Sequence, residues 1–227
     1  MVVSASKKEG GVCIFVPEES GYREKVLAYL SRCIGRKVTM NAISEELGLS
    51  YGYVHATIYK LYSEGIVKME QVGNYKLLSV DLSNMLAVAE LVRVHVKMAR
   101  EVLGTSAKLK KLEVLTNDLG KRKDILSIVL FGSQARLEAR KTSDIDLLII
   151  ISERRTAAVQ DIKSEVRTFE VREFLKIQPF IVDFTMFGRM LQSREELNVG
   201  KEALKDGIIL HGYENYWKMV GEALGQE

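Results

Sequence analysis

Two short apolar runs separated by a polar stretch constrain the fold of this chain more than any other feature. Residues 125–131 read ILSIVLF, and residues 145–151 read IDLLIII. Each run is rich in β-branched and large apolar side chains and is too short for a free-standing helix, so each predicts a buried strand. Between them stand Gly132 and Ser133, which predict a sharp turn, and then ten further residues that end just before Asp144.

Two aspartates begin the second strand. Asp144 and Asp146 are two residues apart, and side chains two apart in a strand point to the same face. Two carboxylates so close repel each other unless a cation lies between them. Glycine at 132 lets a phosphate approach the backbone, Ser133 adds a hydroxyl, and the start of a short helix over about 133–140 attracts phosphate through its free N–H groups. Mg²⁺ prefers carboxylate and phosphate oxygens, so the segment predicts a magnesium–phosphate site.

A third carboxylate stands in another apolar run. Residues 180–187 read FIVDFTMF, with Asp183 alone among apolar side chains. An isolated aspartate in such a strand is costly unless it is paired or bound to a metal. We expect this strand to lie beside the one that Asp144 and Asp146 begin, so that the three carboxylates converge. Residues 154–176 would supply the helix that crosses between the two strands.

A strand, Gly-Ser, ten residues, Asp-x-Asp and a later acid together resemble the polymerase-β-like nucleotidyltransferase superfamily. The fit is closest to its small prokaryotic branch, the minimal nucleotidyltransferases, and covers about residues 105–212, including EALKDGIILHG. The resemblance implies that Asp144, Asp146 and Asp183 are catalytic and bind two Mg²⁺ ions. It also implies an NTP substrate, ATP being the expected one, and transfer of its monophosphate, AMP, to an acceptor hydroxyl with release of pyrophosphate. The nucleotide-binding residues would be Gly132, Ser133, Arg136, Arg140 and Lys141.

Two positions depart from the pattern of that family. Its small members often have arginine where Gln134 stands and glycine where Leu137 stands. Losing a cation weakens triphosphate binding, and Leu137 alters how the short helix meets the site. Neither change removes a metal ligand, so the resemblance still implies an enzyme, a nucleotidyltransferase. For Arg136, Arg140 and Lys141, surface salt bridging is the alternative to phosphate contact.

The first eighty residues follow a different pattern. Helical spacing of apolar residues, N-cap residues and glycine breaks predict three helices, over about 22–34, 39–47 and 50–64. Two short strands around Gly73-Asn74 predict a hairpin. This order resembles the winged helix-turn-helix family over roughly residues 20–80, which implies a third helix in the DNA major groove. Its outward, DNA-binding positions would be Tyr51, Tyr53, His55, Thr57, Tyr59 and Lys60. Acidic residues are also present, so a protein-docking module is the alternative.

These patterns divide the chain into three parts and predict an α+β fold. Residues 1–81 form the N-terminal winged helix-turn-helix domain, and residues 82–120 form a helical connector. Residues 121–227 form a small mixed-sheet nucleotidyltransferase domain with flanking helices. The connector carries several lysines, which form either a solvated helix face or a cationic wall beside a polyanion.

Composition excludes several other classes of protein. The formal net charge of the 227 residues is +3, which by itself does not indicate nucleic acid. Cys13 and Cys33 form neither a disulfide framework nor a metal-ligand pattern, and they suit a reducing cytoplasm. No apolar run reaches the roughly 18 residues of a membrane span, and no signal peptide is evident. We therefore expect a cytoplasmic protein without a membrane partner.

The sequence supports two functions. The three acids favour nucleotidyl transfer by an enzyme that also binds DNA. The winged helix supports the alternative, a DNA-binding transcriptional regulator whose nucleotidyltransferase-like domain senses nucleotide without catalysis. No thumb or fingers region is left over for a template-directed polymerase. The expected partners are an NTP, DNA and an acceptor that is a protein, an RNA end or a small molecule, and the oligomeric state is open, a homodimer included.

Overall fold

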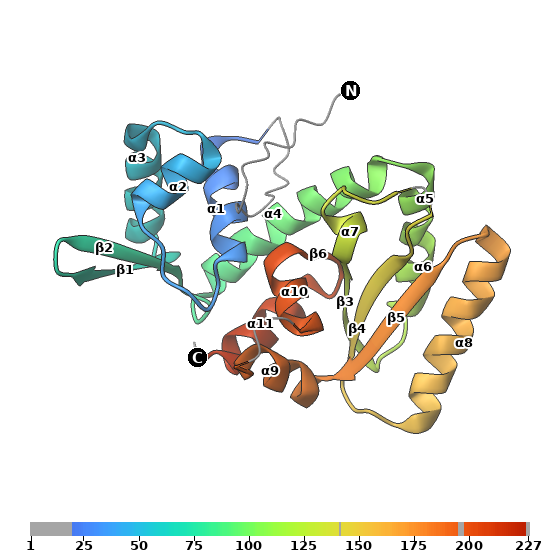
Figure 1. Ribbon diagram of the computed structural model, residues 1–227. Helices are drawn as coiled ribbons and strands as arrows, with labels where there is room; N and C mark the ends of the chain where they lie inside the picture. The colour runs from blue at the N-terminus through green and yellow to red at the C-terminus, as the bar shows by residue number, and fades with distance from the viewer. Residues whose placement is uncertain (1–19, 141, 195–197, 226–227) are drawn as a thin grey trace.

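The computed structural model describes residues 20–140, 142–194 and 198–225, so Cys13 and Lys141 lie outside the described residues. Within this part of the chain, three helices and a hairpin form an N-terminal unit, a long helix α4 follows, and the C-terminal domain is built on a four-stranded sheet (Figure 1). The mixed α+β class expected from the sequence is confirmed.

The N-terminal unit follows the expected element order. Its elements are α1 (Tyr22–Arg32), α2 (Met40–Leu47), α3 (Tyr51–Ser63), β1 (Val67–Val72) and β2 (Tyr75–Val80). Thr39 and Ser50 cap α2 and α3, because their hydroxyl oxygens accept hydrogen bonds from the backbone N–H groups of Ala42 and Tyr53. The hairpin turns at Gly73 and Asn74, as predicted. The assignment of this unit to the winged helix-turn-helix family stays a prediction.

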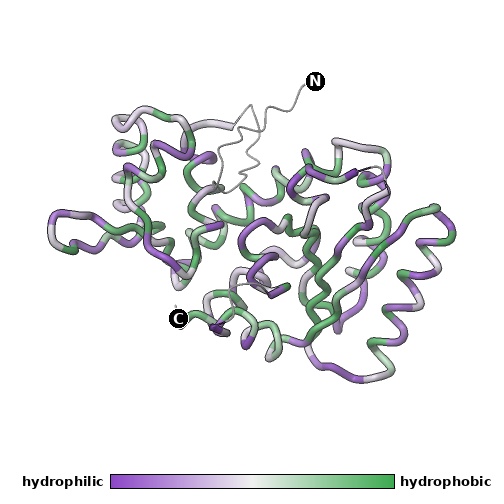
Figure 2. The backbone as a smooth tube through the Cα atoms, in the orientation of Figure 1, coloured by the Kyte–Doolittle hydropathy of each residue, from purple (hydrophilic) through white to green (hydrophobic). Residues whose placement is uncertain are grey.

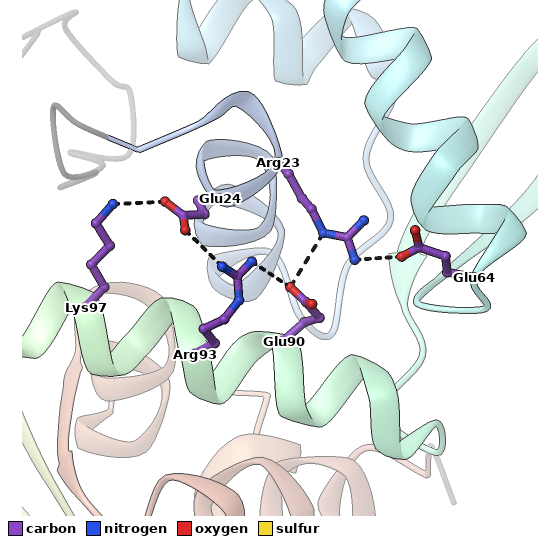
Figure 3. Close-up of polar contacts among 6 residues, drawn as sticks. All are labelled: Arg23, Glu24, Glu64, Glu90, Arg93 and Lys97. Atoms are coloured by element: carbon purple, nitrogen blue, oxygen red, sulfur yellow. Dashed lines mark hydrogen bonds and ion pairs between the residues drawn. The ribbon is translucent and has the colours of Figure 1, made fainter.

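A charged network holds α1 and α3 against α4 (Met85–Gly104). Glu24 on α1 contacts Arg93 at 3.1 Å and Lys97 at 3.0 Å, and Arg23 bridges Glu64 and Glu90 (Figure 3). Burial disfavours the charge on Glu24, but the two cations outweigh it and hold the pKa of that carboxyl below its ordinary value. The basic residues on this stretch of α4 are therefore neutralised within the molecule.

After α4 the chain makes two short helices, α5 (Ala107–Lys110) and α6 (Leu112–Leu119). The connector expected over residues 82–120 is helical, as predicted, but its last part is divided at Lys111. The ammonium of Lys111 reaches across to the carbonyl oxygen of Glu173 at 3.0 Å and to its carboxylate at 3.2 Å. The break therefore coincides with a contact to the end of a distant helix.

The sheet of the C-terminal domain is mixed, as expected. Its strands are β3 (Ile125–Phe131), β4 (Ile145–Ile151), β5 (Ile177–Asp183) and β6 (Ile208–His211), in the order β5-β4-β3-β6. β3 is antiparallel to β4 and β6, whereas β4 and β5 are parallel. The parallel pair requires a crossover, which α8 (Thr156–Glu173) provides in the predicted place.

Helices cover both faces of this sheet. α6 and α8 lie on one side, and α9 (Phe184–Gln192), α10 (Val199–Asp206) and α11 (Tyr213–Ala223) lie on the other (Figure 1). Hydrophobic residues concentrate along the strands, while α8 is largely hydrophilic along its outer side (Figure 2). Over the described ranges, none of the helices has the length and apolar character needed to cross a membrane.

Candidate nucleotide site and the surface of α3

The turn after β3 lies directly against an aspartate of β4. Phe131, the last residue of β3, is paired with Asp146. Gly132 then adopts a φ of +70°, and a Cβ atom there would lie 2.5 Å from Oδ2 of Asp146. A residue with a side chain at this position would force the Asp146 carboxylate to move. The structure thus brings together the Gly-Ser turn and the acidic strand, as predicted, although the helix after the turn, α7 (Gly132–Ala135), is shorter than expected.

Asp144 and Asp146 differ in their surroundings. Asp144 is exposed just before β4, whereas Asp146 is half-buried. Burial raises the pKa of Asp146, and the negative charges of Glu202 and Asp144 raise it further. Glu202 comes from α10 and was not predicted from the sequence, because only the tertiary packing brings α10 to this end of the sheet. The site therefore gathers negative charge that a bound cation would relieve.

The expectation that Asp183 converges with this pair is wrong. In the register of β4 and β5, Asp146 stands beside Gln178, whereas Asp183 stands beside Ile151 at the opposite end. Five residues of strand separate those positions, roughly 16 Å at about 3.3 Å per residue. Oδ1 of Asp183 accepts a hydrogen bond from the backbone N–H of Met186 at 2.7 Å and caps α9. The strand position next to Asp146 is occupied by an exposed, neutral glutamine.

The donor set fits one Mg²⁺ ion shared with a substrate. Mg²⁺ is usually held by one or two carboxylates together with phosphate oxygens, and Asp144 and Asp146 can supply that pair. Throughout the described residues, no group of three or more His, Cys, Asp or Glu side chains is arranged to hold a metal ion by itself. The expected second ion depended on Asp183 as a ligand, and Asp183 lies at the opposite end of the strand pair.

The predicted phosphate-binding cations are differently placed. Arg136 forms an ion pair with Glu202 at 2.9 Å and a weaker one with Glu138 at 3.3 Å, so the salt-bridge alternative describes its state in this structure. Arg140 is exposed on the loop before β4, and its backbone N–H donates to the hydroxyl of Ser143. Ser133 is half-buried at the turn. Lys141 lies outside the described residues.

The two unusual positions in this segment have structural consequences. Gln134 is buried, and its amide donates hydrogen bonds to the carbonyl oxygens of Ser143 (3.3 Å) and Asp144 (3.4 Å). It therefore ties the turn after β3 to the start of β4. Leu137 has a φ of +58°, the left-handed region that favours glycine. The chain keeps the backbone shape of a glycine position while placing a half-buried leucine there.

One family model matches the part of the chain that contains these residues. Residues 113–210 match the family model described as Polymerase beta, Nucleotidyltransferase. The match supports the polymerase-β-like superfamily for the C-terminal domain and indicates nucleotidyl transfer in general. No curated protein and no solved structure matches the chain.

The six residues of α3 predicted to meet DNA form two rows. Tyr51, His55 and Tyr59 lie one helical turn apart, with ring centroids 5.9 and 4.4 Å apart, and Lys76 from the hairpin lies over the Tyr59 ring. The remaining three, Tyr53, Thr57 and Lys60, lie about half a turn around the helix, and Tyr53 stacks on Tyr22 of α1 at 4.4 Å. The first row borders a hollow of about 250 Å³ between α2, α3 and the hairpin.

Two of the lysines on and beside the hairpin are paired with acids. Lys68 of the hairpin forms an ion pair with Asp81 at 2.9 Å, and Lys37 pairs with Glu70. Lys60 is exposed on α3. The surface of α3 therefore combines a row of aromatic rings with Lys60 and with Lys76, whose ammonium donates to the Tyr59 hydroxyl.

Proposed function

We propose that this protein transfers a nucleoside monophosphate, AMP in the first instance, from Mg²⁺-bound NTP to an acceptor hydroxyl. The observation that carries the proposal is the Gly132 turn folded against the Asp146 carboxylate, beside Asp144, within the segment 113–210. In this reaction the acceptor oxygen bonds to the α-phosphorus and gives up its proton. The bond from that phosphorus to the bridging oxygen breaks, and pyrophosphate leaves with the electron pair.

The residues of the turn have distinct roles in this proposal. Asp144 and Asp146 would hold the cation, and Gly132 keeps the backbone accessible to the triphosphate. Ser133 would donate its hydroxyl to a phosphate oxygen. A bound Mg²⁺ would stabilise the charge that develops on the phosphoryl oxygens. Arg136 would contact phosphate by exchanging its present partner, Glu202, for the substrate.

One observation favours a second function. Gln178 stands beside Asp146, where a third carboxylate would be needed to assist the acceptor. A glutamine neither carries negative charge nor accepts a proton at neutral pH. The alternative is therefore a regulator that binds Mg²⁺–NTP at Asp144 and Asp146 and senses it without transfer.

The two functions separate in one experiment. The full chain is incubated with α-labelled ATP, Mg²⁺ and cell extract, and label transfer is followed alongside calorimetric Mg²⁺–ATP binding. Asp144→Ala with Asp146→Ala should abolish both transfer and binding while the protein stays folded, because the change removes mutually repelling charges. Wild-type binding without transfer supports the sensor, and binding that survives in the double variant contradicts the site.

We further propose that the N-terminal unit contacts duplex DNA through α3 and the hairpin. The support is the exposed set of aromatic rings and donors on α3 next to a hairpin. Because Lys68 is paired with Asp81 and Lys37 with Glu70, Lys60 and Lys76 are the main cations left to release counterions, and the salt dependence of binding should be shallow.

Fluorescence anisotropy of labelled duplexes over a salt series tests this proposal with the full chain. Lys60→Ala should flatten the remaining salt slope if Lys60 meets phosphate. Lys68→Ala, which removes an ion-paired lysine, is the matched control and should change it less. Absence of binding to any duplex would favour a protein-docking surface.

A further inference from the structure

We infer that Lys108 of α5 is a phosphate-binding residue of the nucleotide site, with its ammonium placed at the start of β4. The inference rests on the proposed function for the chemistry of the substrate. Its basis is the position of one connector lysine that is remote in sequence from the Gly-Ser turn and the acidic pair. The sequence allowed the connector lysines to form either a solvated face or a cationic wall, and did not place Lys108 in the site.

Lys108 reaches the strand that carries the acids. Its ammonium donates a hydrogen bond to the carbonyl oxygen of Ser143, the residue immediately before Asp144. The same carbonyl oxygen accepts a hydrogen bond from the amide of Gln134. The ammonium therefore lies where α7, the loop before β4 and the acidic pair meet. Burial lowers the pKa of Lys108, and the nearby Asp144 carboxylate counteracts that shift.

Lys108 retains capacity for a ligand. An ammonium has three N–H donors, and the carbonyl of Ser143 uses one of them. Across the described part of the chain, Lys108 forms no ion pair with a carboxylate, whereas Arg136 is paired with Glu202 and Lys111 with Glu173. Among these three cations, Lys108 is the one that a phosphate could engage without first displacing an acid.

The charge balance of the site gives this ammonium a role. Asp144, Asp146 and Glu202 are all acidic, and Glu202 already occupies Arg136. A triphosphate adds several further negative charges, and binding of such a group depends on positioned cations as well as on Mg²⁺. One ion and a neutralised arginine leave that charge incompletely compensated. Lys108 supplies positive charge beside the carbonyl oxygen of Ser143, in addition to the exposed Arg140 of the same loop.

The alternative is that Lys108 only braces the loop before β4. A brace and a phosphate ligand differ in what they require, because a brace needs a donor for Ser143 whereas a phosphate ligand needs positive charge. Lys108→Gln keeps an amide donor and removes the charge, and Lys108→Arg keeps the charge. Lys110→Gln is the matched control, since Lys110 is on the same helix and faces solvent.

The test measures binding of Mg²⁺–ATP and of Mg²⁺–tripolyphosphate to the full chain by calorimetry at several salt concentrations. Lys108→Gln should weaken both about tenfold and should make binding less dependent on salt, because a screened charge is lost. Lys108→Arg should bind within about threefold of wild type, and Lys110→Gln should match wild type.

Three outcomes overturn the inference: wild-type affinity in Lys108→Gln, equal weakening in the Gln and Arg variants, or an unchanged salt dependence. Tripolyphosphate binding separates this inference from the proposed function, because it requires neither base nor acceptor. If tripolyphosphate binding depends on the charge of residue 108 but no nucleotidyl transfer is found, Lys108 remains a phosphate-binding residue and the proposed enzymatic function is contradicted. A wild-type protein that binds neither probe would contradict both.

Discussion

At the scale of single residues, the contact between Gly132 and Asp146 makes the strongest demand on side-chain identity in the candidate site. A Cβ atom at residue 132 would lie 2.5 Å from a carboxylate oxygen, and the φ of +70° disfavours any side chain there. The backbone at residue 132 and the Asp146 carboxylate can therefore lie this close only because residue 132 has no side chain. A change at residue 132 should move the proposed metal ligand as well as strain the turn.

Gly132→Ala should lower the free energy of unfolding by about 1 kcal/mol through the backbone. It should also weaken Mg²⁺–ATP binding severalfold, because the Asp146 carboxylate must turn away. Gly48→Ala is the control, since Gly48 has a φ of +61° but, among the described residues, nothing lies within 4 Å of its added Cβ. Denaturant unfolding and calorimetry should show similar destabilisation in both variants and a binding loss only at residue 132. Equal binding losses would contradict the contact argument.

At the scale of secondary-structure elements, local patterns predicted what each segment is, and tertiary register decided what it does. The strands β3 and β4 and the crossover α8 lie where the sequence predicted them. The strand predicted over residues 180–187 is wrong in its bounds, because β5 runs from Ile177 to Asp183 and α9 begins at Phe184. The face of a side chain follows from its parity along a strand. The position of a side chain along the sheet depends on the register between β4 and β5. No local sequence pattern specifies that register, so the sequence placed Asp183 next to Asp146 incorrectly.

Glu202 shows the complementary limit of sequence reasoning. It stands on α10 in an ordinary amphipathic pattern, and only the packing of α10 beside α7 and β4 brings its charge to Asp146. Gln134 was recognised as unusual from the sequence, but its role in tying the turn to β4 needed coordinates. The sequence thus predicted contacts between residues that a short turn connects. It did not predict contacts that form only when distant helices and strands pack together.

The position of Asp183 leads to a prediction at this scale. Asp183→Ala should destabilise the protein by about 1 kcal/mol, because α9 loses its N-cap. Mg²⁺–ATP binding should stay at the wild-type level, since Asp183 is roughly 16 Å from the row of Asp146. Asp183→Asn keeps a capping oxygen and should be close to wild type in both measurements. A loss of binding in either variant at full stability would return Asp183 to the site.

At the scale of the whole molecule, a buried polar cluster joins the N-terminal unit to the C-terminal domain. His95 on α4 lies 3.1 Å from the hydroxyl of Ser31 on α1 and meets Trp217 of α11 edge-on, with ring centroids 5.0 Å apart. Buried apolar side chains of both parts continue around it as one core. We propose that the two parts unfold together, although each has its own pattern in the sequence.

Charge also links these parts through α10. Asp206 lies near the end of α10, 3.9 Å from Arg136, and its pKa is raised by burial against the opposing charges of Arg32 and Lys205. Arg32 is buried at the end of α1. The charges that surround Asp146 therefore continue, through Glu202, Arg136 and Asp206, to a helix of the N-terminal unit. A nucleotide that draws Arg136 away from Glu202 would change the field felt at α1.

The buried histidine of this junction gives a pH prediction. Burial, aided by the charge of Arg32, lowers the pKa of His95 to about 3. Above pH 6.5 the ring is neutral in both the folded and unfolded states. Between that pH and about 3 the unfolded chain binds a proton that the folded protein excludes, so the free energy of unfolding should fall by up to about 1.4 kcal/mol per pH unit. His211, whose pKa burial also lowers, should add to the slope.

Equilibrium unfolding from pH 7 to pH 5 measures this effect above the ordinary range of carboxyl pKa values. The raised pKa values of Asp146 and Asp206 act in the opposite direction, so the contribution of His95 is the difference in slope between wild type and a His95 variant. Trp217 is the chain's single tryptophan, so its fluorescence reports the junction, and far-ultraviolet circular dichroism reports the whole fold. Wild type should lose stability as the pH falls, with the two signals in one transition, because both parts share this core. His95→Gln should lower stability at pH 7 and reduce the slope, whereas Lys110→Gln should change neither. Separate transitions would show that the parts unfold independently, and an unchanged slope in His95→Gln would mean that His95 is not the group that excludes the proton.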